Sequence, residues 1–385
     1  MSQKNKWLFV LPWEISYPGG VNQVVSNLLA EFDKDPEVKG GLLIDCHYKG
    51  SDENTGVDRI LLSNPFWSPG LIGLVKYIVK IPGIFLKLRT IISGDVVCVN
   101  SHYPSLNVIN YIFYKRVFLC KWKIVLSFHG LDIKGIETSV GMERRFWLYV
   151  FQKVDAIVFC SYFLAQHFLN LVGDKYQDKI IVIHNGINPD LLARESVGYE
   201  LLPNGLDTRP FILNVATFEY KKGQDLLIKS FSKIRRVHNV KLCLIGREAS
   251  ELDYYKALVR DLGCEDDVIF FENVKHSDVM AFFKKARLFC LPSRFEPFGI
   301  VLLESGFLGC PVVATKVGGI PEIITDGYDG YLFESEDVDE LTSVLDTVLR
   351  NPERAEQSAV CLKEKIIRNF TWHYAAEKYL KILSD

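Results

Sequence analysis

Short apolar runs of five to seven residues alternate with amphipathic stretches of ten to sixteen residues along most of this chain. Such runs suit buried strands, and the stretches between them suit helices that cross back over a sheet. This alternation is typical of parallel sheets, so the sequence predicts an α/β protein. The predicted strands are residues 7–11, 41–46, 95–100, 123–128, 156–160, 180–183, 211–215, 241–245, 268–271, 288–291 and 312–315.

The alternation breaks once, between Asn185 and Pro210, where Gly, Pro and Asn are frequent. At about 100 to 200 residues per domain, a chain of 385 residues holds two domains, so we expect the boundary in this stretch. Residues 1–195 and 205–370 each have the pattern of a doubly wound, Rossmann-like domain. Residues 371–385 have the apolar spacing of an amphipathic helix, which must pack on one of the domains. Ligands of such sheets bind at the carboxyl ends of the strands, so we expect a site in a cleft between the domains.

Charge and cysteine content exclude several classes of protein. The chain has 45 Lys and Arg against 47 Asp and Glu, a formal net charge of -2, so no whole-chain attraction to nucleic acid is expected. Nine cysteines are scattered in apolar runs without the spacing of zinc or dithiol sites, which indicates buried thiols in a reducing cytoplasm. Residues 1–6 are polar and no apolar run reaches roughly 18 residues, so neither a signal peptide nor an integral membrane protein is predicted.

The first candidate site is the glycine pair Gly19-Gly20, between the first predicted strand and a helix. Adjacent glycines let the backbone approach a ligand closely, and the N–H groups of a helix start attract phosphate. A simple turn is the alternative. The Gly-x-Gly-x-x-Gly spacing of a dinucleotide fingerprint is missing, which counts against a dehydrogenase.

The second candidate is a pair of carboxylates, Glu296 and Glu304, in a run that leads into an apolar helix. Pro297 suits the first position of that helix, which places Glu296 just before it and Glu304 about two turns along. The two carboxylates could then bind two sets of hydroxyl groups. Alternatively, Glu296 interacts with the helix dipole and Glu304 is a solvated surface residue.

Further candidates follow the ends of predicted strands: His129, Lys221, Lys222 and Arg247. Cations there suit phosphate and a His suits a ligand, while a solvated helix start and a structural hydrogen bond are the alternatives. No cluster of His, Asp and Glu has metal-binding spacing, and no Gly-x-Ser-x-Gly motif is present. The sequence therefore disfavours metal and serine-hydrolase chemistry.

The order of these pieces resembles the retaining glycosyltransferases of family 4, which have the GT-B fold. The resemblance covers nearly all 385 residues and is strongest between Phe289 and Phe333. This stretch contains Ser-Arg-Phe-Glu-Pro-Phe-Gly, Gly-Cys-Pro-Val-Val-Ala, Gly-Gly-Ile-Pro-Glu and Gly-Tyr-Asp-Gly-Tyr-Leu-Phe. The Gly-Gly turn, His129-Gly130, Asn185-Gly186 and Lys222-Gly223 also fall in the family's order. The resemblance implies two Rossmann-like domains facing across a cleft, with the terminal helix crossing back onto the first.

The family's roles carry over by position. Glu304 would bind the ribose hydroxyls of a nucleotide, Glu296 a hydroxyl of the donor sugar, and Lys222 the diphosphate. His129 would contact the sugar beside the reacting carbon, so His129, Lys222 and Glu296 form the implied catalytic set. Main-chain groups would make the other implied contacts. The sugar and diphosphate would meet Gly19, Gly20, Phe298, Gly299 and Ile300. The base would meet Phe271, Asn273 and Val274.

One departure concerns the charge beside the diphosphate. Many members place an Arg two or three residues after the strand that begins the second domain, and the run from Val215 to Glu219 has none. We therefore expect Lys221 or Arg247 to supply a second positive charge. The implied reaction needs no metal, cofactor or protein nucleophile, because the leaving diphosphate can accept the acceptor's proton on the same face. We favour UDP as the nucleotide.

The stretch between Ile60 and Val125 is strongly basic. It contains eight basic residues against one acidic residue, a local excess of +7, interleaved with apolar residues such as Tyr77, Phe118 and Trp122. This mixture is expected of a surface that lies on anionic lipid, and a solvated helix face over a core is the alternative. Peripheral contact with the inner face of a membrane would suit a lipid-linked acceptor.

The sequence thus predicts a hexosyl-type retaining transferase that moves a sugar from a nucleotide-diphosphate sugar to a glycan or lipid-linked acceptor. Its product would be a cell-surface polysaccharide, lipopolysaccharide or glycolipid. Two alternatives stay open: a non-catalytic scaffold that binds a nucleotide sugar, and a nucleotide-sugar epimerase of the same fold, which needs no acceptor. The missing Arg favours the scaffold, while Glu296, Glu304, Lys222 and the paired glycines count against it.

Overall fold

The computed structural model describes residues 4–17, 19–45, 57–64, 66, 70–92, 94–195, 206, 209–247 and 249–384. The chain divides into two compact units: Met1–His184 with Trp372–Asp385, and Asn185–Thr371. The second unit begins inside the range 1–195 that the sequence assigned to the first domain, because helix α7 (Pro189–Glu195) packs on α10 (His276–Lys285) of the second unit. Cys46, at the end of a predicted strand, and residues 196–205, in the predicted boundary, lie outside the described residues.

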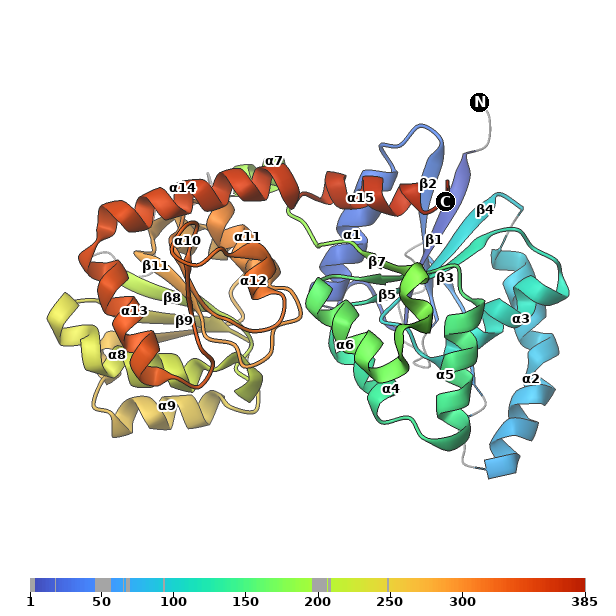
Figure 1. The fold of residues 1–385 in the computed structure, drawn as a ribbon, viewed down its shortest axis with the longest axis horizontal. Helices are drawn as coiled ribbons and strands as arrows, with labels where there is room; N and C mark the ends of the chain where they lie inside the picture. The colour runs from blue at the N-terminus through green and yellow to red at the C-terminus, as the bar shows by residue number, and fades with distance from the viewer. Residues whose placement is uncertain are drawn as a thin grey trace. The chain divides into compact units, whose positions relative to one another are not determined.

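The first unit is built on a seven-stranded sheet in the order β3-β2-β1-β4-β5-β6-β7, and its neighbouring strands are parallel (Figure 1). Apart from residues near their starts, its central strands are buried, as expected where crossover helices cover both faces. The strand order reverses between β1 and β4, which creates a topological switch point. The strands are β1 (Asn5–Leu11), β2 (Val38–Ile44), β3 (Asp58–Arg59), β4 (Val96–His102), β5 (Lys123–Phe128), β6 (Ala156–Phe159) and β7 (Ile180–Val182).

The helices of the first unit include one from the far end of the chain. Helix α15 packs on α1, and the Tyr379 ring of α15 lies 6.1 Å from that of Trp7. The Tyr379 hydroxyl lies 3.1 Å from Oγ of Ser127, and Lys123 Nζ donates to the Ile382 carbonyl at 2.6 Å. The apolar face predicted for residues 371–385 is the face that is buried. The helices are α1 (Gly20–Phe32), α2 (Gly70–Ile91), α3 (Ile109–Val117), α4 (Lys134–Glu137), α5 (Gly141–Lys153), α6 (Tyr162–Val172) and α15 (Trp372–Lys381).

Helix α2 carries much of the basic stretch, and the aromatic residues near it are core residues. Tyr77 is 3% exposed and its hydroxyl donates to Oδ1 of Asn110 at 3.1 Å, while Tyr111 and Trp122 are buried. The expectation that Tyr77 and Trp122 face lipid is therefore wrong, because these rings fill the space between helices and sheet. Exposed apolar residues among the described side chains include Val75, Ile78, Val79 and Leu86 on α2, and Val117, Phe118 and Leu119 at the end of α3. No helix within the described residues is long and apolar enough to span a membrane.

The second unit contains a six-stranded sheet in the order β10-β9-β8-β11-β12-β13, and its neighbouring strands are again parallel. Its switch point lies between β8 and β11, so the α/β class with two Rossmann-like domains is confirmed. The strands are β8 (Phe211–Val215), β9 (Lys241–Gly246), β10 (Val268–Glu272), β11 (Leu288–Leu291), β12 (Val312–Thr315) and β13 (Tyr331–Phe333).

Helices cover both faces of this second sheet (Figure 1). Helices α8, α9 and α13 share one apolar core with the sheet. Helix α14 packs closely on α11, because a Cβ added to Gly306 of α11 would lie only 2.5 Å from Leu362 of α14. The cysteines that the structure describes are free thiols, and most are buried, as their apolar runs predicted. The remaining helices of this unit are α8 (Gln224–His238), α9 (Leu252–Asp261), α11 (Ile300–Phe307), α12 (Ile320–Ile323), α13 (Val338–Arg350) and α14 (Pro352–Asn369).

The start of α11 differs from the prediction. The helix begins at Ile300 and not at Pro297, because Gly299 before it has a φ of 104°, which is outside the helical region. Residues 292–299 are therefore a loop after β11, and Glu304 lies just over one turn into the helix and not two. The predicted stop holds: Gly309 follows the helix with a left-handed φ of 79°.

Candidate active site

The loops after β8 and β11 meet at the carboxyl edge of the second sheet. The loop after β8 forms a single 3-10 turn, η4 (Tyr220–Lys222), and continues into Gly223, whose φ of 67° is left-handed. A Cβ on Gly223 would lie 2.0 Å from the carbonyl oxygen of Pro292, in the loop after β11. Only glycine allows the two loops to approach this closely.

Lys222 and Glu296 form an ion pair across these two loops. Nζ of Lys222 lies 2.8 Å from Oε2 of Glu296, and the two side chains are only 19% and 10% exposed. Oγ of Ser293 lies 3.5 Å from the same carboxylate oxygen. The backbone of Glu296 is also held, because its carbonyl accepts the N–H of Gly319 at 3.0 Å. The structure thus brings together two of the three residues predicted to be catalytic.

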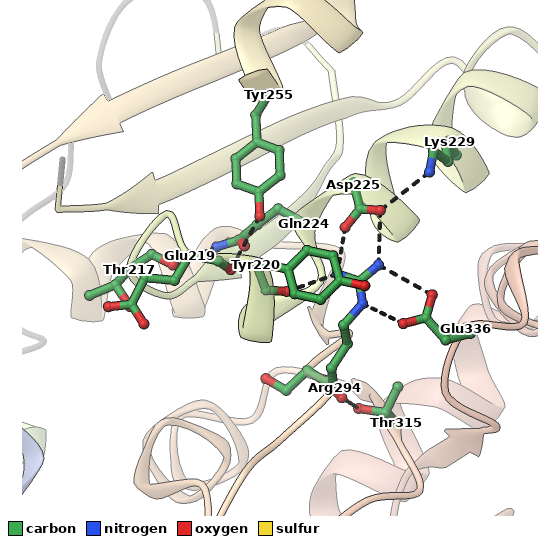
Figure 2. Close-up of polar contacts among 11 residues, drawn as sticks. Thr217, Glu219, Tyr220, Gln224, Asp225, Lys229, Tyr255, Arg294, Thr315 and Glu336 are labelled. Carbon is green, nitrogen blue, oxygen red and sulfur yellow. Dashed lines mark hydrogen bonds and ion pairs between the residues drawn. The ribbon is translucent and has the colours of Figure 1, made fainter. Parts of the chain in front are cut away.

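Arg294 joins the same two loops through a second group of charges (Figure 2). Its guanidinium donates to both carboxylate oxygens of Asp225 on α8, at 2.7 and 2.9 Å, and it also binds Glu336. Burial opposes ionisation of Asp225, but the bonds from Arg294 and Lys229 lower its pKa overall. Sequence reasoning gave Arg294 no role, because its partners are 69 and 42 residues away in the chain.

Glu304 projects from α11 with a side chain that is 8% exposed, and it accepts a hydrogen bond from Nε2 of His276 at 2.8 Å. The other ring nitrogen, Nδ1, lies 3.6 Å from a carboxylate oxygen of Glu195. The hydrogen bond to Glu304 raises the pKa of His276, against the opposing effect of burial. His276 was not predicted as a site residue, because a lone His at a helix start has no readable signal.

Lys221 and Arg247, which were expected to replace the missing arginine, have different surroundings. Lys221 forms an ion pair with Glu219 at 2.6 Å, with both side chains about one third exposed. Arg247 follows β9 and is exposed, and its carbonyl accepts the N–H of Phe218 at 3.4 Å. Both residues follow strands at the same edge of the sheet, and the choice between them stays a prediction.

The segment expected to meet the base follows β10. Asn273 has a left-handed φ of 56°, and its N–H donates to the Gly246 carbonyl at 2.9 Å. The Phe271 ring packs 5.3 Å from that of Phe282, and Val274 is half-buried. Because the Phe271 ring packs within the unit, main-chain groups are the better candidates for ligand contact here.

The segment expected to meet the sugar and diphosphate leads into α11. Phe298 is 2% exposed, and its ring lies 6.0 Å from that of Phe370, so its side chain belongs to the core. Gly299 precedes the helix and Ile300 is its first residue. The first N–H groups of a helix have no partner within it, so main-chain donors are present where the sequence expected them.

Gly19 and Gly20 open α1 at the switch point of the first sheet. A Cβ on either residue would meet no atom within 4 Å, so packing within the unit does not require glycine there. The preceding loop is held by Asn22, which accepts a bond from Nε1 of Trp13 at 2.7 Å and donates to the Tyr17 carbonyl at 2.6 Å. A fixed loop beside open space suits a close ligand contact at the two glycines.

His129 follows β5 and pairs with His102 at the end of β4, a residue that sequence reasoning missed. Nδ1 of His102 lies 2.9 Å from Nε2 of His129, and the rings stack with centres 5.1 Å apart. Burial lowers the pKa of His129 to about 4 and lowers the pKa of His102 well below its usual value, so both rings are neutral near pH 7. Asp132 accepts the N–H groups of His129 and Gly130 at 2.8 Å each, and burial raises its pKa to about 6.

The outer nitrogens of this histidine pair are unsatisfied. Two neutral imidazoles carry one N–H each, and the bond between the rings uses one of them. His102 Nε2 and His129 Nδ1 are buried and have no hydrogen-bond partner among the described residues. One donor and one acceptor are therefore left over, and each such buried group costs about 1–3 kcal/mol. His129 is thus a neutral, buried hydrogen-bonding group.

Metal binding has no structural support within the described ranges. No group of three or more His, Cys, Asp or Glu side chains among those residues could hold a metal ion. Independence from metals and cofactors stays a prediction from the sequence.

The edge of the second sheet offers a cation and carboxylates, which suit phosphate and hydroxyl groups, and the edge of the first sheet offers neutral hydrogen-bonding groups. Residues 18–191 match the family model Glycosyltransferase Family 4, and residues 203–360 match that of glycosyl transferases group 1. An uncharacterized glycosyltransferase of Methanocaldococcus jannaschii is 31% identical over 274 residues, 69% of this chain and 70% of the relative. The chain therefore belongs to the family 4, group 1 glycosyltransferases.

A second relative has a named activity. The GDP-mannose-dependent α-(1-6)-phosphatidylinositol monomannoside mannosyltransferase of Mycolicibacterium smegmatis is 26% identical over 275 residues, 68% of this chain and 70% of the relative.

Solved structures agree with the GT-B fold. A glycosyltransferase from Rickettsia africae has a TM-score of 0.77 at 18% identity, covering 99% of this chain and 98% of its own. Anabaena HepE in complex with UDP and glucose has a TM-score of 0.73 at 20% identity, covering 99% of each chain.

Proposed function

We propose that this protein is a retaining hexosyltransferase that moves a sugar from a nucleoside diphosphate sugar to a glycan or lipid-linked acceptor in cell-surface polysaccharide, lipopolysaccharide or glycolipid synthesis. The carrying observation is the ion pair between Lys222 and Glu296 at the switch point of the second sheet, with 2.8 Å between charged atoms. A diphosphate needs a cation and a sugar hydroxyl needs an acceptor, and this pair supplies both. The UDP and glucose bound to HepE, and the lipid acceptor in the mannosyltransferase's name, support this choice of substrates.

Donor binding would exchange the partners of this ion pair. Without a ligand, each nearly buried charge compensates the other, which avoids leaving an isolated charge at the sheet edge. With the donor bound, Lys222 would turn to the diphosphate and Glu296 would accept a sugar hydroxyl. Both groups stay paired in both states, so the exchange has a small electrostatic cost.

In the transfer step, the bond between the anomeric carbon and the diphosphate oxygen breaks and its electron pair leaves with that oxygen. The acceptor hydroxyl attacks the same face of the sugar and passes its proton to the leaving oxygen, which gives retention. Lys222 stabilises the charge that develops on the diphosphate. His129, neutral because burial lowers its pKa to about 4, would hydrogen-bond a sugar hydroxyl without adding charge.

The nucleotide can be identified by thermal unfolding with excess UDP, GDP, ADP, dTDP or CMP. A ligand at about 100 times its dissociation constant adds about 2.7 kcal/mol to the unit that it binds. We expect one diphosphate, with UDP favoured, to raise the melting temperature by several degrees, and Glu304→Gln to remove most of this rise. A folded protein that responds to none of them would exclude the proposed donor.

Turnover then separates the enzyme from the alternatives. With the identified nucleotide attached to glucose, mannose or another hexose, we expect release of the diphosphate to require an acceptor glycan or lipid. Donor binding with no release under any acceptor would indicate a scaffold. Conversion of the donor without an acceptor would indicate an epimerase.

The surface of α2 fits the proposed membrane contact of a lipid-linked acceptor. Val75, Val79 and Leu86 are 58%, 74% and 68% exposed and lie on one row of the helix, at spacings of four and seven. Lysines stand one residue further along, at positions 76, 80 and 87, so a basic row flanks the aliphatic one. Helix α2 contains no acidic residue. Such a helix face suits an anionic bilayer.

Sedimentation with lipid vesicles tests this contact. We expect binding to phosphatidylglycerol vesicles at low salt, weaker binding at high salt, and little binding to phosphatidylcholine. Val79→Gln with Leu86→Gln should weaken it several-fold. The matched control is Val360→Gln, at a 57% exposed valine on α14 of the second unit. Absence of binding to anionic vesicles at low salt would exclude the contact.

A further inference from the structure

We propose that Arg294 is a positioning residue that fixes turn η4 so that Lys222 points into the site. Arg294 would not touch the ligand and would act through Lys222. The inference rests on the proposed function only where it assigns Lys222 to the diphosphate.

Arg294 holds the backbone just before Lys222. Its own N–H donates to the Lys221 carbonyl at 2.8 Å, and its Nη1 donates to the Tyr220 carbonyl at 2.8 Å. The guanidinium also lies 4.0 Å from the centre of the Tyr220 ring, and Figure 2 shows the two groups stacked. The two carbonyls that precede Lys222 are therefore both bound by one residue.

Arg294 also holds the chain just after Lys222. Asp225, three residues further on, is the second residue of α8, and it receives both arms of the guanidinium. The two side chains are 11% and 6% exposed, so this ion pair is nearly dry. A planar fork fixes distance and direction together, which a lysine at position 294 could not do. Lys222 thus lies between two anchors that share one guanidinium.

Besides Arg294, polar contacts hold turn η4: the ion pair of Lys222 with Glu296, and the N–H of Phe295, which donates to the Lys221 carbonyl at 3.3 Å. No residue from Tyr220 to Lys222 is buried, so the turn is not held by a hydrophobic core. Within the turn, the Lys222 N–H donates to the Glu219 carbonyl at 2.8 Å. A shift of about 1 Å at a catalytic group can cost roughly 100-fold in rate, so the anchoring of this turn has functional consequences.

The two carboxylates on Arg294 differ in burial, and this predicts a graded response. Asp225 is 6% exposed and Glu336 is 56% exposed. Water can replace Glu336 as a partner but cannot easily replace Asp225. We therefore expect Asp225→Asn to resemble Arg294→Lys, and Glu336→Gln to change ligand affinity less than about twofold.

Chemical labelling tests the positioning without any ligand. Brief acetylation with acetic anhydride, read by mass spectrometry, reports the accessibility of each lysine amine. We expect Arg294→Lys to raise labelling of Lys222 at least threefold, as Glu296→Gln should. Lys365 is the internal control, because it is 26% exposed and paired with Asp329 at 2.8 Å, close to the 19% and 2.8 Å of Lys222. Unchanged Lys222 labelling in a folded Arg294→Lys protein would overturn the proposal.

A double-mutant cycle on UDP affinity, measured by calorimetry, tests whether Arg294 acts through Lys222. We expect Lys222→Met to weaken UDP binding roughly tenfold and Arg294→Lys about fivefold, with the double variant no weaker than Lys222→Met within twofold. If the double variant weakens UDP binding by the product of the two single effects, Arg294 acts independently of Lys222 and the proposal is overturned. Arg287→Lys, at an exposed pair with Glu356, is the matched control and should change nothing.

Two provisions keep these outcomes distinct. If Arg294→Lys does not fold, Asp225→Asn replaces it in both experiments, because it removes the charge that orients the guanidinium and is expected to have the same effect. If the native protein binds none of UDP, GDP, ADP, dTDP and CMP, the proposed function fails, while Lys222 labelling still decides whether Arg294 positions this lysine.

Discussion

The site edges of the two sheets handle buried polar groups in opposite ways. At the edge of the first unit, burial keeps the stacked His102 and His129 neutral and lowers the pKa of both. At the edge of the second unit, ionisable groups lie in pairs: Lys222 with Glu296, and the half-exposed His276 with Glu304, whose hydrogen bond raises the pKa of the histidine. The same residue type, histidine, has its pKa lowered in one unit and raised in the other.

This difference shows that burial and neighbouring groups together decide the direction in which the pKa of a histidine shifts. Desolvation disfavours the charged form of all three imidazoles, but among His102, His129 and His276 only His276 has a carboxylate within hydrogen-bond distance. An edge with paired charges suits an anionic donor, and a neutral edge suits hydroxyl groups. The pH responses of the two units should therefore run in opposite directions.

The largest effect is expected from removing charge at the second edge. Lys222→Met should lower turnover by ~10²- to 10³-fold, because a positioned cation stabilises the leaving diphosphate. Glu296→Ala should be similarly impaired. The double variant Lys222→Met with Glu296→Gln leaves no unpaired charge, so it should stay folded while inactive, as circular dichroism can check. Lys316→Met, at a 58% exposed lysine, is the control, and an equal loss there would remove the special role of Lys222.

The next effect concerns acid stability of the first unit. Below pH 6.5 the unfolded chain protonates His129, while the folded protein resists this down to about pH 4, so folding stability falls in that window. This pKa difference corresponds to about 3 kcal/mol, and His102 adds to it. Asp132 has the opposite effect on stability. Its folded pKa of about 6 lies above its ordinary value, so the folded state binds the proton first and gains stability as the pH falls below about 6.

Comparing the native protein with a variant that lacks both histidines separates their effect on stability from that of Asp132, because both proteins keep Asp132. All six tryptophans lie in the sequence of the first unit, so tryptophan fluorescence during urea unfolding follows that unit alone. The advantage of native protein over His102→Gln with His129→Gln should shrink by more than about 3 kcal/mol between pH 6.5 and 4. Parallel stability curves for the two proteins would mean that the pair is not buried and neutral as described.

Most of the fold could be predicted from the sequence, because long apolar runs report burial directly. The eleven predicted strands all form, with ends that shift by a few residues. Strands β3 and β13 were missed, since two and three residues are too short to show a period. The start of α11 was misplaced because Pro297 fits a helix start by itself, and only the neighbouring Gly299 reveals the loop.

The site was less predictable, because its organisation depends on contacts between distant residues. Lys222, Glu296 and Glu304 could be named from a local motif. Their surroundings could not: His102 and His129 are 27 residues apart, and Arg294 and Asp225 are 69 apart. A single sequence shows which residue types follow each strand but not which side chains pair at the sheet edge.

A smaller effect is expected from the second positive charge beside the diphosphate. The missing family arginine should be replaced by Lys221 or Arg247, and Ala at the effective position should lower turnover at least roughly tenfold. Glu219 already pairs with Lys221 at 2.6 Å, so Glu219→Gln tests whether that lysine is held back from the diphosphate. Unchanged rates for both Lys221→Ala and Arg247→Ala would show that one cation suffices.

The smallest effect is the pH response of the second unit. The pKa of His276 is raised above its unfolded value of about 6.5, so its bond to Glu304 stabilises the folded state fully below pH 6.5. That stability is lost as pH rises through the folded pKa, the reverse of the first unit. His276 is 50% exposed, so solvent screening limits the effect to a few tenths of a kcal/mol. Hydrogen exchange in α10 and α11 at pH 6 and pH 8 should show it, with His276→Gln losing the difference. Equal pH dependence in native protein and variant would mean that the two edges do not differ in the way their histidines titrate.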